Sequence, residues 1–464
     1  MTTTASPFFE ELKQIVGPQG YREGDAIDQK HYKDIMGARK ICPVLHLRPA
    51  NTEQVSQILS LCHQNDQPVS PQGGMTGLVS AAAPLEGEVT LSLDRMNSIL
   101  EVDPYSASIT VEAGTPLQIV QEKADEAGLL FPLDLGARGS CSIGGNLATN
   151  AGGNRVIRYG MMRDLVIGME MVLADGTIIN EMHKLRKNNT GYDLKQLFIG
   201  SEGTLGIITK AVLKLFPKPN SQVVSFCQLN NFEDVSKLLV HMQQHLGGNL
   251  TAFEVLWQNT YEQIQQHVPH VILPFKQATP FSVLVESMGT AGEADQTLFN
   301  QTMEAAFENE LISDAVISQS DKEVQQLWAI RDGATEIPRA IGRMHAYDVS
   351  MAIGDMQYFG EQVEQRIRDQ WPEATISLFG HIGDGNLHVL AHVGEGNREA
   401  HHAVDETIYG IIKELNGAIS AEHGIGLMKK EFLPYSRSSA EIALMKTIKA
   451  SLDPKNILSP GRIF

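Results

Sequence analysis

Two short stretches in the C-terminal half of the sequence carry histidines whose spacing could bind a metal ion. In GHIGDGNLH, an Asp-Gly pair between two β-like runs is typical of a hairpin turn. Folding about that turn would place His381 and His388 on adjacent strands, within reach of one ion. A second stretch, EHGIG, adds Glu422 and His423. Two histidines and one carboxylate predict a zinc-type site with an open position for substrate, although a single histidine on an apolar strand is more often structural.

Three glycine-rich stretches in the N-terminal half are candidates for binding a phosphate-bearing cofactor. PQGGMTG (71–77) could form a nest of backbone N–H groups that suits a diphosphate, with an ordinary surface turn as the alternative. The stretch at 136–153 is long and built of small residues, so a ligand could approach its main chain closely. GSEGTLGII (200–208) could equally be a tight hairpin. No GxGxxG follows a strand and no GxxxxGK[ST] occurs, which disfavours Rossmann and P-loop sites.

The composition narrows the class of protein. A chain of 464 residues is expected to form two or three domains. The 55 acidic residues outnumber the 37 basic ones, and the net charge of −18 disfavours nucleic acid or an anionic membrane as a partner. Four scattered cysteines without a CxxC pair exclude a disulfide scaffold and favour a reducing compartment. No secretory signal and no membrane-spanning segment are expected, so we predict a cytoplasmic protein, with peripheral attachment to a membrane as an alternative.

The elements expected around these motifs indicate an α+β fold rather than a regular βαβ repeat. A helix capped by Asn51 is expected over 51–64, and an alternating run at 165–179 contains an Asp-Gly hairpin turn. Only a loop is expected over 136–160. After Pro219, three successive β-α-β units predict an antiparallel sheet with helices on one face, and the last segment of the chain is mainly helical.

Six motifs taken together resemble one known family. PQGGxTG, SIGGNLATNAGG, GSEGTLGIIT, GHIGDGNLH, SAEHGIG and LDPKNILSPG occur in the order found in FAD-linked D-2-hydroxyacid dehydrogenases of the vanillyl-alcohol oxidase superfamily. That family includes D-2-hydroxyglutarate dehydrogenases, D-lactate dehydrogenases and the flavin subunit of glycolate oxidases. Each motif is weak alone, but six in order are highly specific, and the resemblance covers the chain from about residue 38 to 464.

The resemblance implies three parts of the chain. Residues 1–217 would form a FAD-binding domain of the p-cresol methylhydroxylase (PCMH) type, with two subdomains. Residues 218–410 would form a substrate-binding cap domain, α+β and ferredoxin-like, built on an antiparallel sheet. Residues 411–464 would form a helical segment that packs back on the FAD domain.

The resemblance also assigns residues to the site. FAD would be bound by Pro71, Gly73, Gly74, Thr76, Gly77, Asp134, Ser140, Gly144, Asn146, Thr149, Gly152, Gly153, Glu202, Gly203, Ile207 and Asn456. No histidine lies in the first two loops, so we expect no covalent link to FAD through them. Zinc or another divalent cation would be held by His381, His388 and Glu422, with His423 as the catalytic base. The substrate would contact Arg331 and Thr335, together with His381 and His388.

The implied function is oxidation of a D-2-hydroxyacid to the 2-oxoacid by hydride transfer to the flavin, assisted by the metal. The 2-hydroxyglutarate members carry a lysine two residues before the Asp of YDVS, where this chain has Ala346, so a monocarboxylate and a dicarboxylate substrate both stay open. The electron acceptor would be an electron-transfer flavoprotein, a quinone or a cytochrome, and a homodimer is left open. The alternative function is a non-catalytic or degenerate flavin-binding subunit of an electron-transfer assembly.

Overall fold

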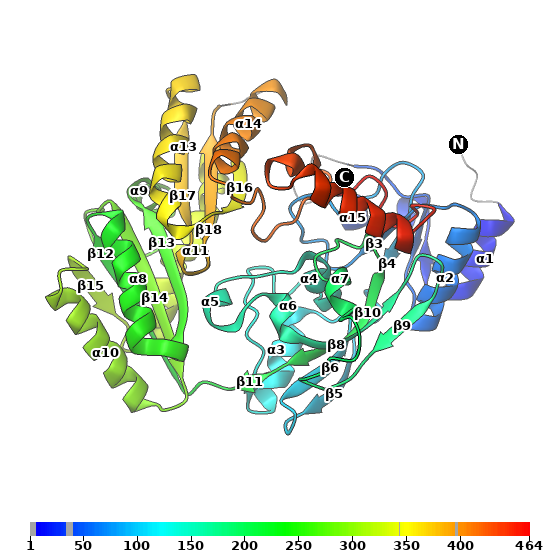
Figure 1. Cartoon of the computed structure of the whole chain (residues 1–464), viewed down its shortest axis with the longest axis horizontal. Helices are drawn as coiled ribbons and strands as arrows, with labels where there is room; N and C mark the ends of the chain where they lie inside the picture. Colours follow the sequence, from blue (N-terminus) through cyan, green and yellow to red (C-terminus); the bar gives the residue numbers. More distant parts are fainter. Residues whose placement is uncertain (1–5, 34–39, 343, 395–397) are drawn as a thin grey trace. The chain divides into compact units, whose positions relative to one another are not determined.

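The protein consists of two compact units, and the chain passes from one to the other four times (Figure 1). The computed structural model describes residues 6–33, 40–342, 344–394 and 398–464. Unit 1 consists of Met1–Gly153, Gly160–Lys218 and Glu422–Phe464. Unit 2 consists of Asn154–Tyr159 and Pro219–Ala421. Among the described helices, none combines the length and the apolar character needed to cross a bilayer.

The first sheet of unit 1 has four strands in the order β1-β2-β4-β3. Their bounds are Tyr21–Arg22, Leu45–Leu47, Val89–Ser92 and Val69–Gln72, and β4 pairs in parallel with both β2 and β3. Helices α1 (Pro7–Val16) and α2 (Thr52–Gln64) belong to the same part of the unit. The helix predicted over 51–64 is confirmed, because the side chain of Asn51 accepts the N–H of Gln54 and caps α2.

The C-terminal tail extends this sheet beyond β3. The N–H of Val69 donates to the carbonyl oxygen of Ile457 at 2.8 Å, and the N–H of Ser459 donates to the carbonyl oxygen of Val69 at 2.9 Å. The tail follows α15 (Ser439–Leu452) and the 3₁₀ helix η7 (Lys430–Tyr435). The last residues of the chain are thereby part of the framework that carries the first glycine-rich loop.

The second sheet of unit 1 has five antiparallel strands in the order β5-β6-β10-β8-β9. Their bounds are Ile99–Asp103, Ser108–Glu112, Ile207–Lys214, Val166–Val172 and Ile178–Glu181. The predicted hairpin turn is confirmed, because the N–H of Leu173 donates to the carbonyl oxygen of Thr177 and Gly176 adopts a φ of 91°. The other elements are α3 (Leu117–Glu126), α4 (Ile143–Thr149), α6 (Met162–Leu165), α7 (Lys195–Phe198), and the short pair β7 (Leu129–Leu130) and β11 (Phe216–Pro217).

Helix α4 was missed by the sequence analysis, which predicted only a loop there. Gly144 and Gly145 lie in its first turn and disfavour a helix by propensity alone. Contacts with the rest of the unit override that preference. The side chain of Ser142 accepts the N–H of Gly145, and the N–H of Gly144 donates to the carbonyl oxygen of Ala113.

Unit 2 is built on one antiparallel sheet of seven strands, which confirms the predicted sheet type. The order is β15-β12-β14-β13-β17-β18-β16. The strands span Asp314–Ile317, Ser221–Leu229, Phe281–Gly289, Leu250–Trp257, Thr375–His381, Asn386–His392 and His345–Ser350. The helices are α5 (Val156–Tyr159), α8 (Phe232–Leu246), α9 (Gln258–His267), α10 (Glu293–Glu308), α11 (Asp321–Gly333), α12 (Ile337–Ile341), α13 (Met356–Gln370) and α14 (Arg398–Glu414).

Helices cover both faces of this sheet, so the prediction of one covered face was incomplete. On one face, Trp257 of β13 packs against Phe232 of α8 and Gly360 of α13. On the other face, residues such as Phe379 and Leu284 share a buried cluster with side chains of α9, α11 and α12. That second face also carries Glu254, which lies two positions before Leu256 of the cluster on β13 and therefore points to the same side.

Candidate active site and flavin-binding loops

The first two glycine-rich loops of unit 1 pack against each other through their backbones. A Cβ atom on Gly74 would lie 2.0 Å from the carbonyl oxygen of Ser140, and one on Gly73 would lie 2.4 Å from the hydroxyl oxygen of Ser142. Approaches this close require glycine. The loops at 71–77 and 136–153 are therefore neighbours although about 60 residues separate them in the sequence.

The third loop, at 200–206, joins the first two. A Cβ atom on Gly203 would lie 2.5 Å from Cγ of Pro71. The N–H of Glu202 donates to the carbonyl oxygen of Ala148 at 2.8 Å. All three loops that the sequence singled out thus lie side by side within unit 1.

The first loop offers a row of backbone donors. The N–H groups of residues 73–77 form no hydrogen bond with any residue that the structure describes. Met75 has a φ of 59°, in the left-handed region that anion-binding nests use. A diphosphate would satisfy several of these donors at once. The loop therefore fits the part of FAD that the sequence analysis assigned to it.

Gln72 anchors this loop through a buried pair of histidines. Its Oε1 lies 2.9 Å from Nδ1 of His31, and its Nε2 donates to the carbonyl oxygens of His31 and Ala82. The ring centroid of His31 lies 4.1 Å from that of His46. Burial lowers the pKa of both histidines, that of His46 to about 3, so both rings are neutral at pH 7. The neutral ring of His31 therefore holds Gln72 by donating from Nδ1 to its Oε1.

The carboxylate of Glu202 holds the EHGIG segment. Its two oxygens accept the N–H groups of Ile425 and Gly426, each at 2.8 Å. The residue is 8% exposed, and burial raises its pKa despite these two donors. The sequence analysis assigned Glu202 to the cofactor, and its contacts add a second role, which is to fix the segment that contains His423.

The EHGIG segment also meets the end of the second loop. The N–H of Gly153 donates to Oε1 of Glu422. Gly153 has a φ of 110°, and a Cβ atom there would lie 2.1 Å from the carbonyl oxygen of Asp134. Four of the six motifs, together with Asp134, thus converge within unit 1.

A row of four charged or polar side chains crosses adjacent strands of the unit 2 sheet. In the register, Glu254 of β13 is opposite His381 of β17, and His388 of β18 is opposite Asp348 of β16. Oε1 of Glu254 lies 2.6 Å from Nδ1 of His381, and the Nε2 atoms of the two histidines are 3.4 Å apart. Nδ1 of His388 lies 3.9 Å from Oδ1 of Asp348. The prediction that the two histidines lie on adjacent strands is confirmed.

This arrangement fits a divalent cation. Both histidines turn Nε2 toward the other ring, and His381 has a carboxylate at hydrogen-bond distance from Nδ1, which is the pattern of a metal-binding histidine backed by a carboxylate. The carboxylate beside His388 is more distant, at 3.9 Å. The third predicted ligand, Glu422, follows Ala421 directly in the chain, and the N–H of Ala421 donates to the carbonyl oxygen of Asp348. Imidazole nitrogens and a carboxylate oxygen are the ligands that zinc takes in catalytic sites.

Arg331 of α11 lies on the same face as this row. Its Nε donates to Oε2 of Glu254 at 2.9 Å, and its Nη2 lies 3.1 Å from Nε2 of His381. Because a guanidinium only donates, His381 accepts at Nε2 and carries its hydrogen at Nδ1, facing Glu254. Burial alone would raise the pKa of Glu254, but the interactions of its carboxylate with His381 and Arg331 outweigh burial and lower that pKa to about 2.

Two predicted cofactor residues make local contacts with their side chains. The hydroxyl of Thr149 donates to the carbonyl oxygen of Gly145 at 3.0 Å, and the amide of Asn146 lies 3.7 Å from Sγ of Cys141. Both contacts stabilise the second loop itself. The remaining predicted cofactor residues lie within the three glycine-rich loops or at their ends: Thr76, Gly77, Gly144, Gly152 and Ile207.

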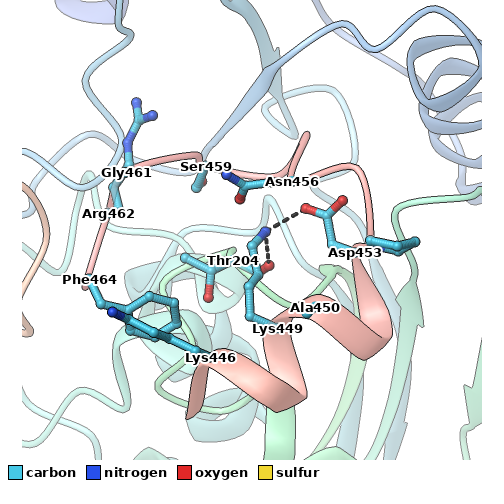
Figure 2. Close-up of a pocket in the computed structure, with 11 residues that line it drawn as sticks. Thr204, Lys446, Lys449, Ala450, Asp453, Asn456, Ser459, Gly461, Arg462 and Phe464 are labelled. Atoms are coloured by element: carbon cyan, nitrogen blue, oxygen red, sulfur yellow. Dashed lines mark hydrogen bonds and ion pairs between the residues drawn. The ribbon is translucent and has the colours of Figure 1, made fainter. Parts of the chain in front are cut away.

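Two further predicted residues lie apart from these contacts. Thr335 is exposed one helical turn after Arg331, and its hydroxyl donates to the carbonyl oxygen of Asp332. Asn456 is exposed and lines a shallow cavity of about 300 Å³ between α15 and the C-terminal tail, as Figure 2 shows. Of the three glycine-rich loops, only Thr204 contributes to the lining of that cavity.

Glu254 and Asp348 were not predicted from the sequence, although both left a signal there. Glu254 is the one charged residue in the strand LTAFEVLW, and Asp348 stands between the apolar neighbours Tyr347 and Val349. A carboxylate inside an apolar strand is rarely buried unless it is paired. Both are buried here, with exposed fractions of 1% and 0%.

The contact between the first two loops predicts that Gly74→Ala will release FAD. The added methyl group would lie 2.0 Å from the carbonyl oxygen of Ser140, so the loops must separate. Gly354→Ala is the control, because Gly354 lies in unit 2 and a Cβ atom there meets nothing within 4 Å. We expect the purified Gly74 variant to lose most of its visible flavin absorbance and the Gly354 variant to keep it. Equal flavin content in the two variants would contradict the packing described here.

Comparisons with known proteins identify the family of the chain. The family model described as "FAD binding domain" matches residues 43–181, and the one described as "FAD linked oxidases, C-terminal domain" matches residues 218–463. The chain is 38% identical to the mitochondrial D-2-hydroxyglutarate dehydrogenase of Arabidopsis thaliana over 97% of this chain and 80% of that protein. It is 40% identical to a putative mitochondrial D-lactate dehydrogenase of Schizosaccharomyces pombe, over 90% of this chain and 81% of that protein.

Solved structures show the same fold at low sequence identity. The 4-ethylphenol oxidase of Gulosibacter chungangensis matches with a TM-score of 0.77 at 17% identity, over 100% of this chain and 97% of that one. The p-cresol methylhydroxylase structure matches with a TM-score of 0.76 at 16% identity, over 98% and 95%. The predicted α+β fold of the PCMH type is therefore confirmed. Together with the family models and the close relatives, this places the chain in the family of FAD-dependent D-2-hydroxyacid dehydrogenases.

Proposed function

We propose that this enzyme oxidises a substrate of the D-lactate or D-2-hydroxyglutarate type to the 2-oxoacid, with His423 as the base and a divalent cation assisting. The observation that carries the proposal is the row on the unit 2 sheet, in which two facing imidazole nitrogens lie 3.4 Å apart beside the guanidinium of Arg331. Imidazole ligands and a carboxylate-binding arginine are what a 2-hydroxyacid needs at its two polar groups.

Each group of residues has one task in the proposed reaction. Arg331 binds the substrate carboxylate by charge-assisted hydrogen bonds. His381, His388 and Glu422 would hold the cation, which would supply a Lewis acid for the substrate hydroxyl. His423 takes the hydroxyl proton as a general base. The backbone of the glycine-rich loops holds FAD, which supplies the acceptor for the hydride that leaves C2.

The fixed position of His423 supports its role. The N–H groups of Ile425 and Gly426, two and three residues further on, are both held by the buried carboxylate of Glu202. Glu422, the residue before His423, accepts the N–H of Gly153. A base held on both sides loses little freedom when the substrate binds, which favours proton transfer.

The substrate class is tested by flavin bleaching. The purified protein should be yellow, and under anaerobic conditions one member of a panel of D-lactate, D-malate, D-2-hydroxyglutarate and glycolate should bleach its flavin bands. Ala346 of β16 brings no charge for a second carboxylate, so the panel includes monocarboxylates and dicarboxylates. A folded protein without flavin, or flavin that no hydroxyacid reduces, would contradict the proposal.

Removal of the cation is expected to slow flavin reduction without releasing FAD. The imidazole ligands lie on the unit 2 sheet, whereas the loops that hold FAD belong to unit 1. A chelator followed by gel filtration should leave the flavin absorbance intact and lower the rate constant of bleaching, and added zinc or manganese should restore it. Metal analysis that finds no bound ion in fully active protein would remove the cation from the mechanism.

The cellular setting is part of the proposal. The four scattered cysteines without a CxxC pair favour a reducing compartment such as the cytoplasm. The electrons would pass from the flavin to an electron-transfer flavoprotein, a quinone or a cytochrome, and the chain would act alone or as a homodimer. The alternative of a non-catalytic flavin-binding subunit has no support from the relatives, which are named as dehydrogenases.

A further inference from the structure

We propose that Glu254 is a positioning residue that orients both the metal ligand His381 and the substrate-binding Arg331. This inference rests on the proposed function, because it concerns the residues that hold the cation and the substrate. Glu254 touches neither of these two groups in the proposal. It acts through the two side chains that its carboxylate holds.

The contacts of Glu254 use both of its oxygens. Oε1 lies 2.6 Å from Nδ1 of His381, and Oε2 accepts Nε of Arg331 at 2.9 Å. The side chain is 1% exposed and comes from β13, the strand next to the one that carries His381. A buried carboxylate with two such partners holds each of them in one orientation.

The contact with His381 decides which ring nitrogen is available to a metal. Since Nδ1 carries the hydrogen that faces Glu254, the lone pair of His381 lies on Nε2, which faces both His388 and Nη2 of Arg331. A carboxylate at this position also raises the basicity of the imidazole, which strengthens its bond to a cation. Loss of the carboxylate should therefore weaken metal binding. Replacement by glutamine, which has the same shape without the charge, should weaken it as well.

The contact with Arg331 fixes the direction of the guanidinium. Glu254 accepts Nε and Nε2 of His381 accepts Nη2, which leaves Nη1 as the donor for a substrate carboxylate. The ring of Phe379 supports the same guanidinium, with Cζ 5.6 Å from the ring centroid. When Glu254 is replaced, Arg331 loses this anchor, and the Michaelis constant for the hydroxyacid should rise even when the metal site is full.

Glu254→Gln separates these two effects. We expect the metal dissociation constant, measured by competition with a chromogenic chelator, to rise about 10–100-fold. At saturating metal, the rate constant of flavin bleaching should return toward the wild-type value while KM for the D-hydroxyacid stays raised. Glu254→Asp keeps the charge on a shorter side chain and should fall between the wild type and the glutamine variant in metal affinity.

Glu286→Gln is the matched control. Glu286 is also a fully buried carboxylate on the same face of the sheet, and it accepts Nε of Arg155 at 3.1 Å. Its loss should reduce stability to a similar degree but leave metal affinity unchanged. Melting temperatures of all variants show whether a loss of metal binding merely follows from unfolding, and the aspartate variant carries the test if the glutamine variant does not fold.

The outcomes distinguish this inference from the proposed function. If wild-type protein binds no metal, or if no D-hydroxyacid bleaches its flavin, the proposed function fails. If wild-type protein does both, but Glu254→Gln keeps the wild-type metal affinity and KM, the role of Glu254 is overturned and the proposed function stands. A loss of metal affinity in the Glu286 variant equal to that in the Glu254 variant would also overturn it.

Discussion

The substitution His423→Ala is expected to slow the reduction of bound flavin by substrate about 10²–10⁴-fold, which is the usual contribution of a general base. The change removes the imidazole and leaves in place the contacts of its neighbours that fix the segment. Those contacts run from the backbone of Ile425 and Gly426 to Glu202 and from Gly153 to Glu422. Flavin content and melting temperature should therefore stay near the wild-type values, and the loss should appear in the rate constant of anaerobic bleaching.

His402→Ala is the control for this prediction. His402 lies on α14 in unit 2, half-buried, with Nδ1 3.8 Å from Oε1 of Glu406. Its removal should leave the bleaching rate unchanged. If His423→Ala bleaches as fast as the wild type, another group takes the proton and the assignment of the base is wrong.

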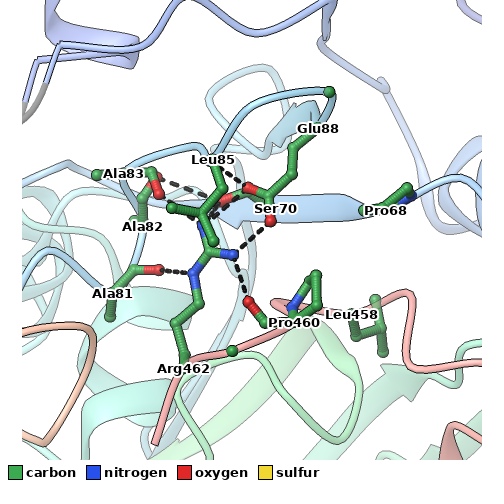
Figure 3. A network of polar contacts seen from close by, with 12 residues as sticks. Pro68, Ser70, Ala81, Ala82, Ala83, Leu85, Glu88, Leu458, Pro460 and Arg462 are labelled. Atoms are coloured by element: carbon green, nitrogen blue, oxygen red, sulfur yellow. Dashed lines mark hydrogen bonds and ion pairs between the residues drawn. The ribbon is translucent and has the colours of Figure 1, made fainter. Parts of the chain in front are cut away.

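Glu88→Gln is expected to destabilise unit 1 by about 3–5 kcal/mol, because it leaves a buried guanidinium without its counter-charge. Figure 3 shows Arg462 of the C-terminal tail beside Glu88 and the carbonyl oxygens of Ala81 and Ala83. The side chain of Arg462 is 0% exposed and that of Glu88 is 2% exposed. The pair joins the tail to the segment that follows the first glycine-rich loop, so flavin should be released at lower urea concentration, measured by the rise in flavin fluorescence.

Glu414→Gln provides the comparison with a surface pair. Glu414 accepts Nη2 of Arg366 at 2.8 Å, but the two side chains are 51% and 33% exposed. Solvent screening limits such a pair to about 0–1 kcal/mol. If Glu88→Gln costs no more than Glu414→Gln, the tail is not the structural support that its buried contacts indicate.

The sequence predicted the chemistry of the motifs better than the structure around them. The order and residue types of the loops were sufficient to predict a flavin site, and the Asp-Gly turn was sufficient to place His381 beside His388. The convergence of the loops was not predictable, because it depends on backbone approaches such as that of Gly74 to Ser140, across more than 60 residues of sequence. Helix propensity likewise gave no sign of α4, which forms through contacts such as that of Gly144 with Ala113.

Buried charges were the other feature that the sequence patterns did not predict. Glu254 and Glu286 each interrupt an apolar strand, and each is paired with an arginine that comes from a distant part of the chain. The sequence could indicate that such a carboxylate needs a partner. Only the fold identifies Arg331 and Arg155 as the partners, since register and helix placement decide which charges meet.

The most direct test is a single-turnover reaction with the D-hydroxyacid that bleaches the flavin, carrying either protium or deuterium at C2. The same reaction is then run with the L enantiomer. The account predicts that the D enantiomer reduces the flavin, that deuterium at C2 slows this reduction, and that the L enantiomer leaves the flavin oxidised. Reduction at the same rate with both enantiomers, or no effect of deuterium when bond cleavage limits the bleaching, would contradict hydride transfer from a D-2-hydroxyacid held by these residues.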